Sequence, residues 1–121
     1  MNKAKQKGTA FETMVLRYLV EVGFKDCYRP ALKGKYDSGD INGIVRDTGV
    51  YDKPVAVQCK NQKTYNFSGW LSDTVEQAER IEGLPALVVK RPGKGEKQVG
   101  DSYAVMRLSD LVELLQDASY T

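Results

Sequence analysis

Three polar residues stand where two neighbouring strands would bring them together. Asp40 opens a segment typical of a β-strand over residues 40–46, and Gln58 and Lys60 lie in a second such segment over residues 55–60. The chain between them is rich in residues that favour turns and loops, namely Asp47, Thr48, Gly49, Asp52 and Pro54. The pattern predicts a β-hairpin with polar side chains gathered at its open end.

The expected pairing of this hairpin brings unlike groups together. If the chain turns at the centre of the intervening segment, counting antiparallel pairs places Asp40 opposite Lys60 or Asn61. Because side chains alternate along a strand, Gln58 and Lys60 share one face and Cys59 points to the other. A carboxylate, an amide and an ammonium group therefore converge.

This combination suits metal-assisted hydrolysis of a phosphodiester. Asp40 offers a hard anionic oxygen for Mg²⁺ or Mn²⁺, and the side-chain carbonyl of Gln58 and the backbone carbonyl of Cys59 offer neutral oxygens. Lys60 would orient or deprotonate the attacking water, or neutralise charge that builds on the phosphate.

Glu12 is a second candidate carboxylate. A helix is predicted over residues 9–22, capped by Thr9 and ended by Gly23, and Glu12 lies within its apolar stripe. A carboxylate beside a core is costly unless it is paired or binds a metal, so we interpret Glu12 as a site residue. The alternative is a salt bridge, or a first-turn glutamate that interacts with the helix dipole.

Set on helix, strand and strand, the order Glu12, Asp40, Gln58-x-Lys60 resembles the PD-(D/E)xK nuclease superfamily. The segment KGTAFE, the basic loop LKGKYDSGD and the hairpin are similar to archaeal-type Holliday junction resolvases, and the glutamine at the third acidic position is similar to Mrr-type restriction endonucleases. The resemblance covers roughly residues 6–90, although Gly39 stands where the family usually has proline. It implies a restriction-endonuclease-like α/β core, Mg²⁺ or Mn²⁺ as cofactor, Glu12 and Asp40 as metal ligands, and branched DNA as substrate.

Composition indicates an ordinary globular protein. The chain of 121 residues is predicted to form one nuclease domain, residues 1–121, with a basic N-terminal arm (1–8) and a frayed tail (118–121). No apolar run approaches the ~20 residues that span a bilayer and no secretory signal is evident, so we expect a cytoplasmic protein without membrane contact. Its size would suit a phage protein acting in the host cytoplasm. With two cysteines and no histidine, neither a zinc site nor a Cys–His pair is expected.

Basic residues cluster around the predicted hairpin although the net charge is only +2. Such clusters can neutralise DNA phosphates without reading sequence, and the alternative is a solvated surface. The candidate DNA-binding residues are Lys7, Arg29, Lys33, Lys35, Asn61, Lys63, Lys90, Arg91 and Lys94. Three nearby aromatic residues would either stack on unpaired bases or cover a core or dimer surface, namely Tyr65, Phe67 and Trp70.

The remaining pattern predicts a mixed β-sheet flanked by helices in the order αβββαββα. The expected elements are a strand over 24–28, a helix over 71–82 capped by Ser68 or Ser72, strands over 86–89 and 103–106, and a last helix capped by Ser109. The 71–82 helix would be a crossover between parallel strands, with Leu71, Val75 and Ala78 inside. Leu111, Val112, Leu114 and Leu115 of the last helix are expected to pack inward.

Three functional hypotheses follow. The first is a Holliday junction resolvase, which would act as a homodimer because two symmetric cuts need two sites. The second is an Mrr-like endonuclease that cuts duplex DNA. The third is a nuclease-fold DNA-binding module without activity, a reading that the neutral Gln58 favours.

Overall fold

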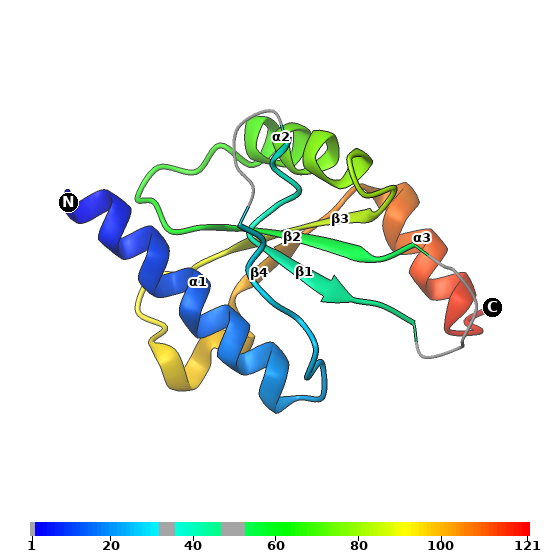
Figure 1. Ribbon diagram of the computed structural model, residues 1–121, viewed down its shortest axis with the longest axis horizontal. Coiled ribbons are helices and arrows are strands. Elements are labelled where there is room, and N and C mark those ends of the chain that lie inside the picture. The colour runs from blue at the N-terminus through cyan, green and yellow to red at the C-terminus, as the bar shows by residue number, and fades with distance from the viewer. Residues whose placement is uncertain (1, 32–35, 47–52) are drawn as a thin grey trace.

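The chain forms a four-stranded sheet with a long helix on each face (Figure 1). The computed structural model describes residues 2–31, 36–46 and 53–121. The elements are α1 (Lys3–Glu21), β1 (Ile41–Ile44), β2 (Val55–Lys60), α2 (Phe67–Glu79), β3 (Leu84–Val89), a 3₁₀ helix η2 (Glu96–Asp101), β4 (Tyr103–Val105) and α3 (Leu108–Asp117). This confirms an α/β architecture with a mixed sheet flanked by helices. None of the helices described is both long and apolar enough to cross a membrane.

The strand order is β1-β2-β3-β4, and only the central pair is parallel. The parallel register runs from Val55 opposite Leu84 to Lys60 opposite Val89. Helix α2 connects these two strands, which confirms the predicted crossover. The carboxyl ends of β2 and β3 therefore meet at one edge of the sheet.

The two faces of the sheet bury different clusters. Phe11 and Val15 of α1 pack on the face that carries Val57 and Cys59. Trp70 of α2 packs with Leu87 and Val89 on the other face, together with Tyr65, Leu71 and Val105. Each cluster follows the alternation of side chains along β2 and β3.

The hairpin register differs from the expected one. Ile41 pairs with Val57 and Ile44 pairs with Val55, with an irregularity between the two pairs. Asp40 donates its backbone N–H to the Val57 carbonyl at 2.8 Å, so it does not lie opposite Lys60 or Asn61. The predicted turn residues 47–52 lie outside the described part of the chain.

Several predicted boundaries were wrong. Helix α1 begins at Lys3 because the Asn2 side chain caps it by accepting from Lys5 N at 2.7 Å, so the basic segment continues the helix and Thr9 is not its cap. The predicted strand over 24–28 is a single bridge between Tyr28 and Asn42. Pro30 follows closely and has no N–H with which to extend a ladder.

Helix α2 is shifted and rotated relative to the prediction. It begins at Phe67, because the Asn66 side chain accepts from Gly69 N at 3.0 Å, and it ends at Glu79. Its buried residues are Trp70, Thr74 and Ala78, so Ala78 lies inside as predicted, whereas Leu71 and Val75 are only partly buried. The Thr74 hydroxyl is satisfied by donating to the Trp70 carbonyl at 2.7 Å.

The last third of the chain departs most from expectation. The predicted loop over 90–101 contains η2, whose Val99 is buried against α1. Helix α3 begins after Arg107, and the four residues expected to pack inward, Leu111, Val112, Leu114 and Leu115, are exposed.

Gly43 should be indispensable to the packing of β1. It has φ +89°, and an added Cβ would lie 2.6 Å from the Asp26 carbonyl oxygen. We expect Gly43→Ala to lower the free energy of unfolding in urea by about 2 kcal/mol or more, because the cost of a strained backbone adds to the cost of a backbone clash. The matched control is Gly8→Ala within α1, where a Cβ meets nothing within 4 Å. This variant should raise the free energy of unfolding by about 1 kcal/mol. Equal stability of the two variants would contradict this account.

Candidate active site

The segment that leads into β1 is fixed by its own polar groups. Asp37 Oδ1 accepts from Gly39 N at 2.8 Å, which forms a turn, and its Oδ2 accepts from Gln77 Nε2 of α2 at 3.3 Å. The buried Ser38 hydroxyl donates to Asn42 Oδ1 at 2.7 Å, and Asn42 Nδ2 donates back to the Ser38 carbonyl at 3.0 Å. These hydrogen bonds therefore hold the loop that carries Asp40.

Gly39 allows this loop to approach β2. Its φ is +108°, and an added Cβ would lie 3.0 Å from the Val57 carbonyl oxygen. Proline has φ near −65°, so the proline usual at this position in the resembled family would not fit this backbone. The departure noted in the sequence thus has a local steric reason.

Asp40 is clamped to β2 at two points. Its backbone N–H donates to the Val57 carbonyl at 2.8 Å, and its Oδ2 accepts from Cys59 N at 2.8 Å. The clamp holds the carboxylate beside the strand that carries Gln58 and Lys60.

Gln58 and Lys60 lie on the α2 face of β2. They are in register with Leu87 and Val89, which belong to the α2-side cluster, and Lys60 Nζ lies 5.9 Å from the centroid of the Trp70 ring. The Gln58 side chain is about nine-tenths buried, yet its Oε1 accepts no hydrogen bond. A buried carbonyl oxygen without a donor calls for a water or a cation.

Glu12 lies on α1, the helix that covers the other face of the sheet. It is next to Phe11, which packs on the Cys59 side. Burial raises the pKa of the Cys59 thiol well above its ordinary range, and the negative charges of Asp40 and Glu12 add to the rise. Both carboxylates are thus close enough to act on the Cys59 thiol.

The donor set fits a hard divalent cation only modestly. Asp40 and the unpaired Oε1 of Gln58 belong to neighbouring chain segments and are oxygen donors, as Mg²⁺ or Mn²⁺ requires. In the part of the chain that is described, no cluster of three or more acidic, cysteine or histidine side chains is present. A bound ion would therefore face fewer negative charges here than in a three-acid site.

A basic groove of about 200 Å³ opens where β2 and β3 end. It contains five of the residues predicted to bind DNA, together with Gln62, Tyr65 and Pro92. Those five are Lys7, Asn61, Lys63, Lys90 and Arg91. They come from three separate segments, which meet because Lys90 N donates to the Lys60 carbonyl at 3.0 Å and continues the parallel pairing.

The other predicted DNA-binding residues do not line this groove. Arg29 donates to the Thr9 carbonyl at 2.8 Å and to the Thr13 hydroxyl at 2.6 Å, which ties it to α1. Lys94 pairs with Asp101 at 3.5 Å. Lys33 and Lys35 lie outside the described residues.

An aromatic cluster borders the groove, and it includes one residue that sequence reasoning missed. Tyr65 stacks on Phe67 with ring centroids 5.2 Å apart, and Tyr103 of β4 packs edge-on against Tyr65 at 6.0 Å. Arg91 lies 5.4 Å from the centroid of the Tyr103 ring. Hairpin counting across residues 90–101 would have brought Tyr103 to this end of the sheet. Trp70 is buried and belongs to the core.

The raised pKa of Cys59 should appear in the pH dependence of stability. Above pH ~8.5 the unfolded chain loses its thiol proton while the folded chain keeps it, so the free energy of unfolding falls as pH rises, by up to ~1.4 kcal/mol per pH unit. We expect Cys59→Ala to reduce this decline between about pH 8.5 and 10 in urea titrations. Cys27→Ala is the control and should reduce it less, because the pKa of Cys27 is raised less. Identical slopes for the wild type and Cys59→Ala would show that this thiol ionises normally.

Comparison of the chain with models of known protein families, with curated proteins and with solved structures gave no match, so its own geometry must carry any functional conclusion.

Proposed function

We propose that this protein is a metal-dependent DNA endonuclease with a restriction-endonuclease-like core, and that it cleaves branched DNA such as four-way junctions. The observation that carries the proposal is the clamp of Asp40 on β2, beside Gln58 and Lys60. Lys60 ends β2 and directly precedes the basic groove. A potential metal ligand, an ammonium group and a phosphate-binding surface thus occur together.

Asp40, Gln58 Oε1 and the Cys59 carbonyl would hold Mg²⁺ or Mn²⁺, with Glu12 adding negative charge from the α1 side. The bound ion supplies positive charge that offsets the charge on the scissile phosphate. Lys60 orients the attacking water and neutralises charge on the phosphate oxygens. Cys59 stays a neutral thiol and takes no part in proton transfer.

The basic groove is suited to the DNA backbone. Lys7, Lys63, Lys90 and Arg91 bring four positive charges to a shallow surface, and none of the described residues that line it is acidic. Ammonium and guanidinium groups contact phosphates without reading bases, which favours recognition of DNA shape. Phe67 and Tyr103, both partly exposed beside the groove, offer ring faces to an unpaired base at a branch point.

Resolution of a junction needs two cuts related by symmetry, and one chain has one candidate site. The functional unit in this proposal is therefore a homodimer.

Gln58 supports a second candidate, which is a nuclease-fold DNA-binding module that does not cleave. A glutamine removes one negative charge from the metal site, and no three-acid cluster exists among residues 2–31, 36–46 and 53–121. An Mrr-like endonuclease acting on duplex DNA uses the same groups on another substrate.

Cleavage of labelled DNA separates these candidates. With Mg²⁺ or Mn²⁺, we expect paired symmetric nicks in a four-way junction, little cutting of linear duplex, and no cutting in EDTA. Asp40→Asn should lower the rate by at least about 100-fold, because it removes the anionic ligand. The matched control is Asp73→Asn on the exposed side of α2, which should cleave at the wild-type rate.

The outcomes of this experiment differ for each candidate. Comparable cutting of linear duplex would favour the Mrr-like assignment. Binding without cutting would favour the inactive module, and Gln58→Glu should then restore metal-dependent cleavage if the missing charge is the cause. In an active enzyme, the same variant should reach half its maximal rate at a lower Mg²⁺ concentration.

The groove predicts a specific salt dependence of DNA binding. Lys63→Ala should weaken binding and reduce the slope of log K against log salt concentration by about 1, because one phosphate contact is lost. The control is Lys25→Ala, an exposed lysine that lines a different pocket, and it should leave the slope unchanged. Fluorescence anisotropy over a range of salt concentrations measures both. An equal loss in the two variants would indicate non-specific attraction by net charge.

A further inference from the structure

The end of helix α2 contacts the loop that leads to Asp40, which passes beside this helix (Figure 1). Gln77 Nε2 donates to Asp37 Oδ2 at 3.3 Å, and Arg80 Nη1 donates to the Asp37 carbonyl. Arg80 Nη2 also pairs with Glu76 Oε1 at 3.3 Å, which limits the movement of the guanidinium group. Two side chains of α2 therefore hold one residue of a loop that comes much earlier in the chain.

The contact made by Gln77 is unfavourable in one respect. Its Oε1 atom is buried and accepts no hydrogen bond from the described residues. Exchanging the oxygen and nitrogen of this amide would not help, because Oε1 would then face the Asp37 carboxylate. An apolar side chain of similar length would fill the same space without an unmet acceptor. Packing alone therefore does not account for a glutamine at this position.

We propose that Gln77 and Arg80 are positioning residues for Asp40, an inference that rests on the proposed nuclease function. By holding Asp37, they fix the start of the segment whose other end, Asp40, is clamped to β2. Asp37 Oδ1 connects the two ends because it accepts from Gly39 N at 2.8 Å. The Asp40 carboxylate is thereby kept in one orientation, as a metal ligand requires.

The position of α2 explains why this third anchor matters. Ser38 ties the loop to Asn42 of β1, and Asp40 ties it to β2, so both of these anchors lie in the sheet. Gly39 has no side chain with which to restrict its own backbone. Anchors within the sheet alone leave the loop free to tilt away from its plane. Gln77 and Arg80 oppose that tilt because α2 stands on one face of the sheet.

Replacing Gln77 by methionine separates positioning from packing. Methionine keeps an unbranched side chain of similar length and removes both the donor and the unmet acceptor. We expect the urea midpoint of Gln77→Met to equal or exceed that of the wild type. Its binding of Mn²⁺ without DNA, measured from the electron paramagnetic resonance signal of free Mn²⁺, should weaken by at least about tenfold. The matched control is Gln98→Met, which removes a contact with Gly95 N at 3.2 Å and should bind Mn²⁺ like the wild type.

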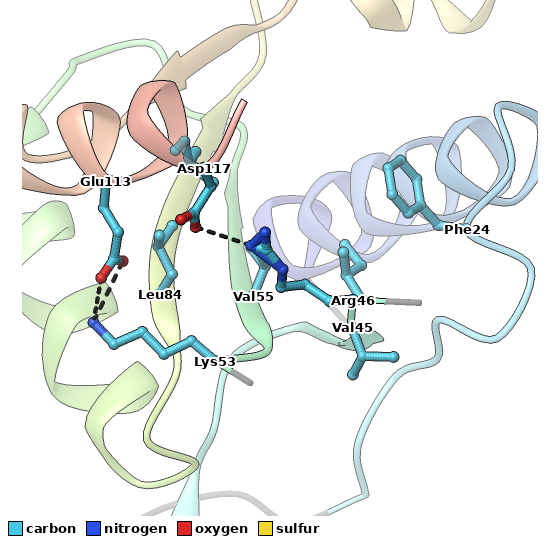
Figure 2. A pocket seen from close by; sticks show the side chains of 10 residues that line it. Phe24, Val45, Arg46, Lys53, Val55, Leu84, Glu113 and Asp117 are labelled. Atoms are coloured by element: carbon cyan, nitrogen blue, oxygen red, sulfur yellow. Dashed lines mark hydrogen bonds and ion pairs between the residues drawn. The ribbon is translucent and has the colours of Figure 1, made fainter. Parts of the chain in front are cut away.

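Arg80 is tested against a cation that holds a different helix. Lys53 pairs with Glu113 of α3 at 3.2 Å, beside a pocket of about 440 Å³ at the start of β2 (Figure 2). Arg80→Met and Lys53→Met each remove one positive charge, so a general electrostatic effect on Mn²⁺ would be alike in both. We expect only Arg80→Met to weaken Mn²⁺ binding, because only this variant releases Asp37.

Reversing the hydrogen bond provides a rescue. Gln77→Glu keeps the shape of the side chain but replaces the donor by an acceptor beside a carboxylate, so Mn²⁺ binding should weaken. In Gln77→Glu combined with Asp37→Asn, the new amide at position 37 can donate to the new carboxylate at position 77. Its oxygen can still accept from Gly39 N. We expect the double variant to recover most of the affinity that Gln77→Glu loses.

The outcomes distinguish this inference from the proposed function. Wild-type Mn²⁺ affinity in both Gln77→Met and Gln77→Glu would overturn the positioning role and leave the nuclease proposal standing. A urea midpoint that falls together with Mn²⁺ affinity in Gln77→Met would also overturn it, because the residue would then serve the fold. A wild type that neither binds Mn²⁺ nor cleaves a four-way junction would overturn the proposed function and this inference with it.

Discussion

The parallel pairing of β2 with β3 is the constraint on which the other features depend. Parallel strands cannot be joined by a tight turn, so the chain needs α2 as a crossover, and α2 then covers one face of the sheet. The same pairing brings the carboxyl ends of both strands to one edge. Residues 61–63 and 90–92 consequently share a groove with Lys7 although they are far apart in sequence. The basic surface is a product of this topology.

The interior contains few polar side chains, and most of them form hydrogen bonds with neighbouring groups. The Ser38–Asn42 pair and the Asp37 turn fix the approach of Asp40, and the Asp40 carboxylate takes the hydrogen bond of Cys59 N. Gln58 is different because its buried oxygen has no donor, which is also true of Gln77 Oε1 on α2. An unmet acceptor in a packed region costs stability, so its presence beside the Asp40 clamp is the strongest local sign of a bound partner.

Helix α3 illustrates why an amphipathic pattern alone does not reveal which face is inside. Its leucines indicated an inward stripe, yet the helix attaches through ion pairs to Lys53 and Arg46 and leaves the leucines exposed. The hydrophobic effect favours the burial of apolar side chains, but it does not specify which surface covers them. The apolar stripe of a helix therefore shows that the helix is amphipathic but not which of its faces meets the core.

The sequence by itself determined the local features: both strands of the hairpin, the crossover helix and the parallel strand after it, because alternation and helical period act over a few residues. It also singled out five residues that line the groove. Tertiary structure decided the hairpin register, which depends on an irregularity between Ile41 and Ile44. It likewise decided the rotation of α2 onto Trp70 and Thr74 and the exposure of the α3 leucines. These depend on which surfaces meet, and such contacts join residues far apart in the chain.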